Sequence, residues 1–359
     1  MTSAPPRQPP AVGVPNSTPV AAFTERELIG RITGRLPPPP AWMLVGIGDD
    51  AAVVEPERSR AEVLTVDALV EGVHFDRAFT PPGAIGHRAL AANLSDLAAM
   101  GAAPRLALLS MAIPPGMPVA EFDAIADGIA RLAARHRVHL AGGNLTSSPG
   151  PLVVDITAIG TVKRRQALTR AGARAGDDIY VSGTIGAAAA GLQALRRAAA
   201  PASSAVARFL YPEPRVRLGV VLARNRAATA CMDLSDGLAD AIRQVAEASG
   251  VGAILDAEAV PIDPAARAWF ESRGADPVHA ALAGGDDYEL LVAVGPRLRR
   301  RLAAVAGSPG APLTRIGVFT EERALIVRRG AHDTPMPEGY QHFRRLAEDE
   351  TAPGGAEGR

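Results

Sequence analysis

Aspartate residues recur in this chain, and several of them lie where strand-like apolar runs end or helix-like runs begin. The recurring acids are Asp67, Asp96, Asp233, Asp236, Asp286 and Asp287, and a glycine-flanked turn at Gly46–Ala52 adds the adjacent pair Asp49 and Asp50. Loops between strands and helices are where folds often present groups to a ligand. Because strands and helices alternate through both halves of the chain, we expect an α/β or α+β fold with helices packed on sheets.

Each of these acids also has a plain structural explanation. Asp is favoured at helix N-caps and next to Gly in turns, and any one of the acids alone is explained well in this way. The whole set is harder to explain so, because caps require neither paired acids nor the same Leu-Ser-Asp string twice, at 94–96 and 234–236. Hard oxygen ligands without a Cys or His companion favour magnesium over zinc.

The composition argues against several classes of partner and location. A length of 359 residues suggests two domains, and a formal net charge of zero gives no reason to expect nucleic acid or an anionic membrane surface. The single cysteine, Cys231, lies in an apolar run, so we interpret it as a core residue and expect a cytoplasmic protein without an internal disulfide. We find no signal peptide and no apolar run of about 18 residues that would span a membrane.

Lys163 is the only lysine in the chain. The sequence therefore contains neither the Gly-x-x-x-x-Gly-Lys-Ser/Thr motif of P-loop proteins nor the Val-Ala-Ile-Lys strand of protein kinases. If this chain handles ATP, it must use metal ions and arginine. Arg170 is a candidate because a guanidinium matches phosphate oxygens, although a solvated basic linker is the alternative there.

The sequence divides into two domains flanked by two tails. Residues 1–22 are rich in Pro, Ser and Ala and are expected to form a disordered tail, as are residues 346–359. The segments 23–161 and 162–345 are each expected to form an α/β domain. Their clearest elements are a capping box at Thr24–Glu27, a helix over 83–100, and strands over 62–69, 105–113, 152–160, 178–182 and 289–294.

Two further loops are candidates for ligand binding, each with an open alternative. His74 lies in a Gly-containing loop close in sequence to the acids, and it is either a substrate contact or an ordinary surface residue. Gly142 and Gly143 end a short strand, where glycine lets a backbone approach a bulky anion, although a simple turn explains them equally well.

Taken together, the motifs resemble those of the thiamine-monophosphate kinases, a family of the aminoimidazole-ribonucleotide synthetase-like superfamily. They occur in that family's order and extend over roughly residues 23–343, as Gly46–Asp50, Thr65–Asp67, Asn93–Gly101, Leu168–Arg170, Asp233–Gly237, Gly284–Leu290 and Gly339–Phe343. A single Gly-Gly-Asp string is a weak signal, whereas all of these motifs in order are a specific one.

The resemblance implies a two-domain fold in which the N-terminal domain binds ATP and magnesium and pairs with its copy in a homodimer. ATP and several Mg²⁺ ions would bind in the cleft between the domains. The implied reaction transfers the γ-phosphate of ATP to thiamine monophosphate and gives thiamine diphosphate and ADP, the last step of thiamine diphosphate biosynthesis. We expect no dedicated general base, because the second phosphate pKa of the acceptor is about 6 and its oxygen is mostly ionised at neutral pH.

The resemblance also assigns roles to individual residues. The magnesium ligands would be Asp49, Asp50, Thr65, Val66, Asp67, Asp96, Asn144, Asp233 and Asp236. Of these, Val66 could act only through its carbonyl oxygen. The nucleotide would contact Gly143, Arg170 and Ser235, and thiamine monophosphate would be held by His74, Asp286 and Tyr340.

Three positions depart from the family's pattern. Val66 stands where the family often has Thr, Asn144 where it often has Asp, and Asp286 where Glu is usual, whereas Tyr340 fits an aromatic position. These departures support the alternative of a catalytically silent nucleotide- and metal-binding regulator of the same fold. Two other superfamily members are disfavoured, because selenophosphate synthetase needs a reactive Cys and a Lys near the N-terminus and the hydrogenase maturation factor needs a Cys beyond Cys231.

Overall fold

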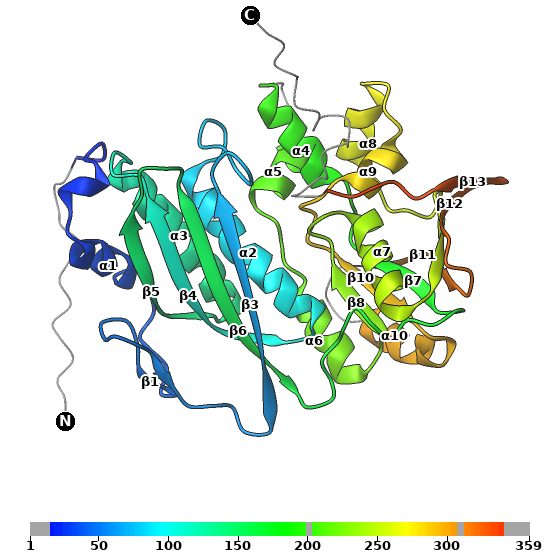
Figure 1. The fold of residues 1–359 in the computed structure, drawn as a ribbon, viewed down its shortest axis with the longest axis horizontal. Coiled ribbons are helices and arrows are strands. Elements are labelled where there is room, and N and C mark those ends of the chain that lie inside the picture. Colours follow the sequence, from blue (N-terminus) through cyan, green and yellow to red (C-terminus); the bar gives the residue numbers. More distant parts are fainter. Residues whose placement is uncertain (1–14, 199–202, 307–311, 341–359) are drawn as a thin grey trace, which may run out of the picture.

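Two α/β parts lie side by side in the computed structural model, which describes residues 15–198, 203–306 and 312–340 (Figure 1). Within these residues the N-terminal part carries a four-stranded sheet and the C-terminal part a seven-stranded sheet. Helices pack on both sheets. This arrangement confirms the predicted α/β class.

Two helices pack on one face of the N-terminal sheet. The strand order within the described residues is β3-β6-β4-β5, with bounds Arg60–Val70 (β3), Val153–Lys163 (β6), Ala103–Ile113 (β4) and His139–Ser147 (β5). Helices α2 (Pro82–Ala99) and α3 (Val119–His136) cover the inner face, where alternate strand residues join the core. Strands β4 and β5 are parallel and α3 connects them, as parallel neighbours require a crossover.

Small residues let α2 and α3 approach each other closely. A Cβ atom added at Gly86 would lie 2.0 Å from the carbonyl oxygen of Ile125, and one at Gly128 would lie 2.1 Å from that of Gly83. Any larger residue at either glycine would therefore push the two helices apart. Helix α2 is buried along nearly all of its length because it lies between the sheet and the C-terminal part.

The outer face of the N-terminal sheet is apolar and exposed. On β3, Leu64 and Val66 are 66% and 59% exposed, and Leu108 on β4 is 36% exposed. These side chains alternate with less exposed ones, as the two-residue period of a strand requires. Large exposed apolar patches are uncommon on monomeric proteins, so this face has the character of a protein interface.

The centre of the C-terminal sheet is buried on both faces. The strand order within the described residues is β13-β12-β9-β11-β7-β10-β8, with bounds His332–Pro335 (β13), Leu325–Arg329 (β12), Gly252–Asp256 (β9), Leu313–Thr320 (β11), Asp178–Ser182 (β7), Leu290–Val294 (β10) and Ala230–Asp233 (β8). Along β10, Leu290 and Val292 join a hydrophobic cluster that continues into the N-terminal part, and Leu291 and Ala293 join a second cluster. The first cluster ties the two parts together.

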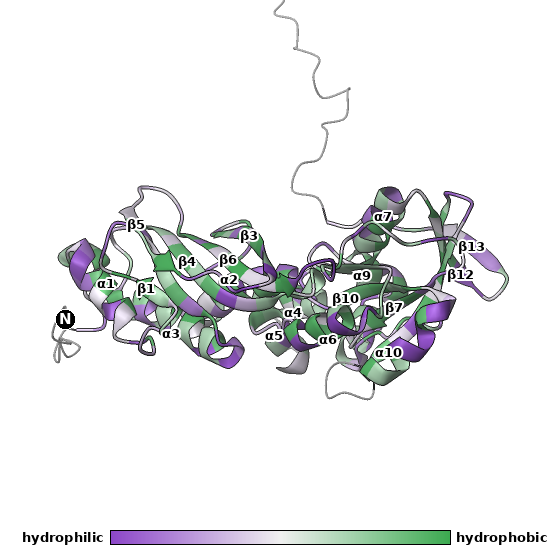
Figure 2. Cartoon of the chain, turned by 90° about the horizontal axis from the view of Figure 1, so that it is seen from below, coloured by the Kyte–Doolittle hydropathy of each residue, from purple (hydrophilic) through white to green (hydrophobic). Residues whose placement is uncertain are grey.

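Helices surround the C-terminal sheet, with bounds Ala187–Arg196 (α4), Ser203–Leu210 (α5), Val216–Asn225 (α6), Leu238–Ser249 (α7), Pro264–Glu271 (α8), Pro277–Ala283 (α9) and Arg299–Ala306 (α10). Figure 2 shows hydrophobic residues along the strands and hydrophilic stretches on outer helices such as α10. No helix among the described residues is long and apolar enough to cross a bilayer. Cys231 is 2% exposed, which confirms its interpretation as a core residue.

The N-terminal segment is ordered nearer to its start than the sequence predicts. The expectation of a disordered tail over 1–22 is wrong for its last part, because the 3-10 helix η1 (Val20–Ala22) buries Val20, whose N–H donates to the Met117 oxygen at 2.8 Å. Residues 1–14 and the expected tail over 346–359 lie outside the described residues. Helix α1 (Glu25–Thr33) has the predicted capping box, and a hairpin of β1 (Met43–Val45) and β2 (Val53–Val54) carries the Gly46–Ala52 turn.

Candidate active site

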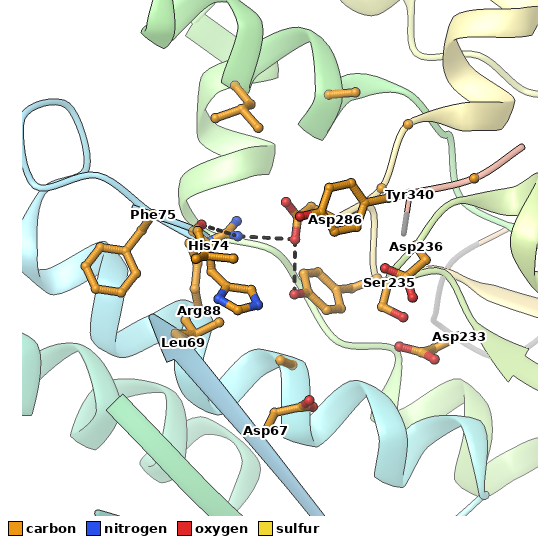
Figure 3. Close-up of a pocket in the computed structure, with 18 of the residues that line it drawn as sticks. Asp67, Leu69, His74, Phe75, Arg88, Asp233, Ser235, Asp236, Asp286 and Tyr340 are labelled. Atoms are coloured by element: carbon orange, nitrogen blue, oxygen red, sulfur yellow. Dashed lines mark hydrogen bonds and ion pairs between the residues drawn. The ribbon is translucent and has the colours of Figure 1, made fainter. Parts of the chain in front are cut away.

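A cavity of about 930 Å³ lies where the two parts of the chain meet. Its walls come from β3 and the loop after it, from α2 and α4, and from C-terminal loops (Figure 3). The predicted site residues that line it are Asp67, His74, Asp96, Arg170, Asp233, Ser235, Asp236, Asp286 and Tyr340. Residues predicted to hold metal, nucleotide and substrate therefore share one cavity, although they are far apart in the sequence.

Other predicted residues lie away from the cavity wall within a single chain. Asp49 and Asp50 are exposed in the turn between β1 and β2, where the Asp50 N–H donates to the Asp49 carboxylate at 2.9 Å. Gly143 and Asn144 are exposed on β5, at the opposite edge of the sheet from β3. The side chain of Val66 is exposed on the outer face of β3. One chain alone does not bring these residues to the cavity.

Asp67 on β3 and Asp96 on α2 form an acidic pair in the cavity wall. Each carboxyl influences the pKa of the other, and the Thr65 hydroxyl donates to Asp96 Oδ2. Burial, followed by the negative charge of Asp96, raises the pKa of Asp67 to about 7. Burial also raises the pKa of Asp96. A nearby cation would stabilise the ionised form of both carboxylates and lower their pKa values.

Asp233 adds a carboxylate from the C-terminal part. Asp233 is the last residue of β8 and is only 3% exposed. The Ser95 hydroxyl of α2 donates to its Oδ2 at 2.8 Å. Burial and the charge of Asp96 raise the pKa of Asp233 to about 7, whereas the hydrogen bond from Ser95 and the positive charge of Arg170 oppose this rise. The two parts of the chain therefore meet through acids and a serine at one end of the cavity.

The acids fit magnesium that is shared with phosphate groups better than a metal held by protein alone. Among the described residues, no three His, Cys, Asp or Glu side chains converge on one point where an ion would bind. Mg²⁺ usually keeps several waters and takes one or two carboxylates together with substrate phosphates. The crowding of Asp67, Asp96 and Asp233, seen in their raised pKa values, is the feature that such ions would relieve.

The acids of the 286–289 loop point in different directions. Asp286 lines the cavity. Asp287 accepts hydrogen bonds from the N–H groups of Gly186 and Ala188 at the start of α4, and burial raises its pKa to about 7. Glu289 is fully buried and pairs with arginines of the C-terminal part. Only Asp286 of these acids is placed to contact a ligand in the cavity.

His74 and Tyr340 line the cavity near Asp286 (Figure 3). The Val70 N–H donates to His74 Nδ1 at 3.1 Å, so the neutral ring carries its proton on Nε2. Tyr340 is 47% exposed, and its backbone N–H donates to the backbone carbonyl oxygen of Asp236 at 3.1 Å. Phe75 and Leu69 add apolar wall beside His74. This side of the cavity suits a ring-bearing ligand.

Sequence reasoning missed several residues of the site. Ser95 lies inside a recognised motif but was assigned no role, although it binds Asp233. Asp155 on β6 adds to the negative charge felt by Asp67. Arg88 is 1% exposed and lines the cavity from α2. An arginine in a helix made mostly of small and apolar residues was the signal that could have identified it.

Comparison with known proteins supports the family. The model for the AIR synthase related protein, N-terminal domain, matches residues 48–162, and that for its C-terminal domain matches residues 174–330. A thiamine-monophosphate kinase of Synechococcus elongatus is 38% identical over 307 residues, which cover 82% of this chain and 91% of the relative. The chain belongs to the thiamine-monophosphate kinase family. The family that the motifs predict is thereby confirmed.

Solved structures of the family share the fold. The thiamine-monophosphate kinase of Stenotrophomonas maltophilia aligns with a TM-score of 0.75 and 40% identity, over 84% of this chain and 95% of that one. AaThiL, complexed with AMPPCP and TMP, aligns with a TM-score of 0.70 and 32% identity, over 83% of this chain and 92% of that one. The two matched family segments leave 163–173 between them, and this connection carries Arg170.

Proposed function

We propose that this family member transfers the γ-phosphate of ATP to thiamine monophosphate and releases thiamine diphosphate and ADP. The observation that carries this proposal is the shared cavity, whose lining combines crowded carboxylates and Arg170 with His74, Asp286 and Tyr340. The AaThiL structure, which contains AMPPCP and TMP, supports the same pair of substrates. The acidic end suits a magnesium-bound nucleotide, and the other end suits a ring substrate.

The acidic end addresses the main difficulty of the reaction. Two polyanions must approach each other, so the site must neutralise charge and align the groups in line. Magnesium supplies this when bound, by balancing the charge of phosphate oxygens. Asp67, Asp96, Asp233 and Asp236 would hold the ions, and the Thr65 hydroxyl would orient Asp96. Arg170 and Ser235 would contact the nucleotide phosphates.

The acceptor end requires binding groups and no base. The phosphate oxygen of thiamine monophosphate is already mostly ionised at neutral pH, since its second pKa is about 6. His74 keeps its Nδ1 occupied by the Val70 N–H, so its Nε2–H is placed to donate a hydrogen bond. The positive thiazolium ring of the substrate suits the carboxylate of Asp286 and the aromatic face of Tyr340.

The first prediction concerns turnover by the wild-type protein. With ATP, Mg²⁺ and thiamine monophosphate, the protein should form thiamine diphosphate and ADP in equal amounts, and chelation of magnesium should stop both. Chromatographic separation of the products measures this directly. A silent regulator would bind ATP with magnesium in calorimetry and form no thiamine diphosphate, and that outcome would direct attention to Val66, Asn144 and Asp286. A cytoplasmic location is part of the same proposal.

We further propose that the N-terminal sheets of two copies pair through the exposed outer face. Leu64, Val66 and Leu108 are large apolar side chains on this face. Strands β3 and β5 are the edges of the described sheet, and free edges and apolar faces are normally covered. A homodimer in which the two sheets close edge to edge, with these apolar side chains turned inward, would cover both features.

Pairing would also account for one predicted residue that lies away from the cavity, Asn144. Strand pairing sets Asn144 level with Ser110, Asp155 and Ala68 across the sheet, so it lies at the same height in the sheet as the residue that follows Asp67. If the two sheets close edge to edge, β3 of one copy lies beside β5 of the other, and we propose that Asn144 of the partner subunit then lies near Asp67. The partner subunit's Asn144 would then complete the acidic end of the cavity.

The second prediction is a subunit-mixing experiment. Asp67→Asn and Asn144→Lys should each inactivate the homodimer, because the first removes a carboxylate and the second adds a positive charge to the same site. Co-expression of the two variants should restore about a quarter of wild-type activity, since half of the dimers are mixed and each mixed dimer has one intact site. Light scattering checks the dimer. A monomer, or mixed dimers without activity, would contradict the shared site.

A further inference from the structure

Arg88 is a buried charge that the proposed reaction does not yet use. It lies in α2, is 1% exposed, and reaches the cavity between the two parts of the chain. Burial of a guanidinium is strongly unfavourable unless its N–H groups are paired. The partners of Arg88 therefore indicate what the chain gains by keeping it there.

The partners of Arg88 come from three segments around the cavity. Its Nη1 donates to the Phe209 oxygen at 2.6 Å, and the guanidinium lies 4.1 Å above the Phe209 ring. Its Nη2 lies 3.2 Å from Asp286 Oδ1 and 3.5 Å from the His74 oxygen. One guanidinium thus contacts both His74 and Asp286, the residues proposed to hold the substrate (Figure 3).

Asp286 is held by two donors on the same oxygen. The buried Tyr288 hydroxyl donates to Asp286 Oδ1 at 3.2 Å, beside the bond from Arg88. Neither donor uses Oδ2, and the Asp286 side chain is 30% exposed in the cavity wall. The carboxylate is therefore anchored at Oδ1 and keeps Oδ2 for a ligand.

The backbone of this loop is strained in a way that fits a positioning role. Asp286 and Tyr288 have φ angles of 66° and 51°, in the left-handed region that non-glycine residues seldom adopt. Hydrogen bonds from their N–H groups to the oxygens of Ser235 and Leu234 hold them there, at 2.7 and 3.0 Å. Such strain persists at functional sites where the surrounding structure determines the conformation.

We propose that Arg88 is a positioning residue for the acceptor substrate, which fixes the Asp286 carboxylate and the His74 backbone relative to each other across the two parts of the chain. The proposal rests on the proposed kinase function, because it names how that site binds thiamine monophosphate. Asp286 is one methylene shorter than the Glu usual in the family, and anchoring by Arg88 and Tyr288 gives the shorter side chain a defined position.

The test is a double-mutant cycle on the Michaelis constants of the two substrates. Arg88→Met and Asp286→Asn should each raise the KM for thiamine monophosphate about tenfold and leave the KM for ATP within about twofold. The double variant should be no worse than Asp286→Asn alone, because Asp286→Asn already removes the negative charge that Arg88 positions. Effects that multiply in the double variant, or an equal rise in both KM values, would overturn the proposal.

Two further variants keep the test decisive. Arg135→Met is the matched control, since Arg135 pairs with Glu213 at 2.6 Å across the same two parts but is 56% exposed and distant from the cavity lining, and both KM values should be unchanged. If Arg88→Met does not fold, Tyr288→Phe is the alternative variant, because it removes the second hydrogen-bond donor to Asp286. This change should raise the KM for thiamine monophosphate about threefold in the wild-type background and should have no effect in the Asp286→Asn background. An effect of Tyr288→Phe that persists in Asp286→Asn would overturn the proposal.

The failure of this proposal and that of the proposed function are distinguishable. If the wild-type protein forms no thiamine diphosphate, the kinase proposal fails, and calorimetric binding of thiamine monophosphate to the same variants still tests Arg88. Wild-type protein that neither turns over nor binds thiamine monophosphate would overturn both proposals.

Discussion

Replacing Asp67 by Asn should lower the kcat for thiamine diphosphate formation on the order of 10³-fold, which corresponds to about 4 kcal/mol of transition-state stabilisation. The substitution keeps the shape of the side chain and removes one negative charge from the acidic pair with Asp96. The main task of the site is to balance the negative charge of the approaching phosphates, and Asp67 would help to hold the magnesium that does so. Loss of this carboxylate should therefore slow phosphoryl transfer itself. The measurement is kcat at saturating ATP, Mg²⁺ and thiamine monophosphate.

A stability measurement separates this loss from misfolding. The pKa of Asp67 is raised to about 7, so the ionised carboxylate is unfavourable in the folded, metal-free protein. A group of this kind contributes stability below its folded pKa and loses it as the pH rises from about 4 through 7. In metal-free buffer at pH 8, Asp67→Asn should therefore unfold no more easily than the wild type.

The control for Asp67→Asn is Glu247→Gln, which removes an exposed acid from α7 and should leave kcat unchanged. A variant at position 67 that keeps more than about a tenth of the wild-type kcat would contradict an essential role for this carboxylate. A large loss of stability in metal-free buffer would instead indicate that Asp67 serves the fold.

The fold and the acids of the cavity wall were predictable because they depend on local patterns. Period-two alternation marks strands such as β3, and the capping box at Thr24–Glu27 marks the start of α1. Asp233 ends β8, whereas Asp67 lies within β3 and Asp96 lies in the last turn of α2. Elements of a two-domain α/β chain converge where the domains meet, so acids near the ends of such elements predict a shared site without knowledge of distances.

The directions of neighbouring side chains were not predictable in the same way. In the 284–290 string, Asp286 faces the cavity, Asp287 binds the first N–H groups of α4, and Glu289 enters the core. The left-handed backbone at Asp286 and Tyr288 breaks the regular alternation of a strand, so no simple period describes this loop. Only the packed structure separates the ligand-facing acid from the structural ones.

The paired acids Asp49 and Asp50 show a second limit. Their turn predicts a cation site, yet within one chain it lies exposed on the β1–β2 hairpin and away from the cavity. Sequence patterns show which side chains a segment carries, but they do not show whether those side chains belong to a site in the same chain or in a second copy of it. The position of these acids is one reason to test the assembly as well as the chain.

Replacing Glu289 by Ala should lower the free energy of unfolding of the C-terminal part by about 3–5 kcal/mol. Glu289 is fully buried, and its carboxylate accepts from Arg208 at 2.8 Å, from Arg215 Nε at 2.6 Å and from the Ser182 hydroxyl at 2.5 Å. Its removal leaves two guanidinium groups without their counter-charge in a site that is partly closed to water. Denaturant unfolding monitored by circular dichroism measures the change.

The matched control is Glu271→Ala, which removes an acid of the same type from an exposed pair. Glu271 lies 3.9 Å from Arg267 on α8 and is 57% exposed, so its loss should change the free energy of unfolding by less than about 0.5 kcal/mol. If Glu289→Ala also stays within about 1 kcal/mol, the arginines have found water or other partners and the buried network is not what holds this loop. A large loss for Glu289 alone would show that one acid of the Gly-Gly-Asp-Asp-Tyr-Glu string stabilises the loop that places Asp286 in the cavity wall.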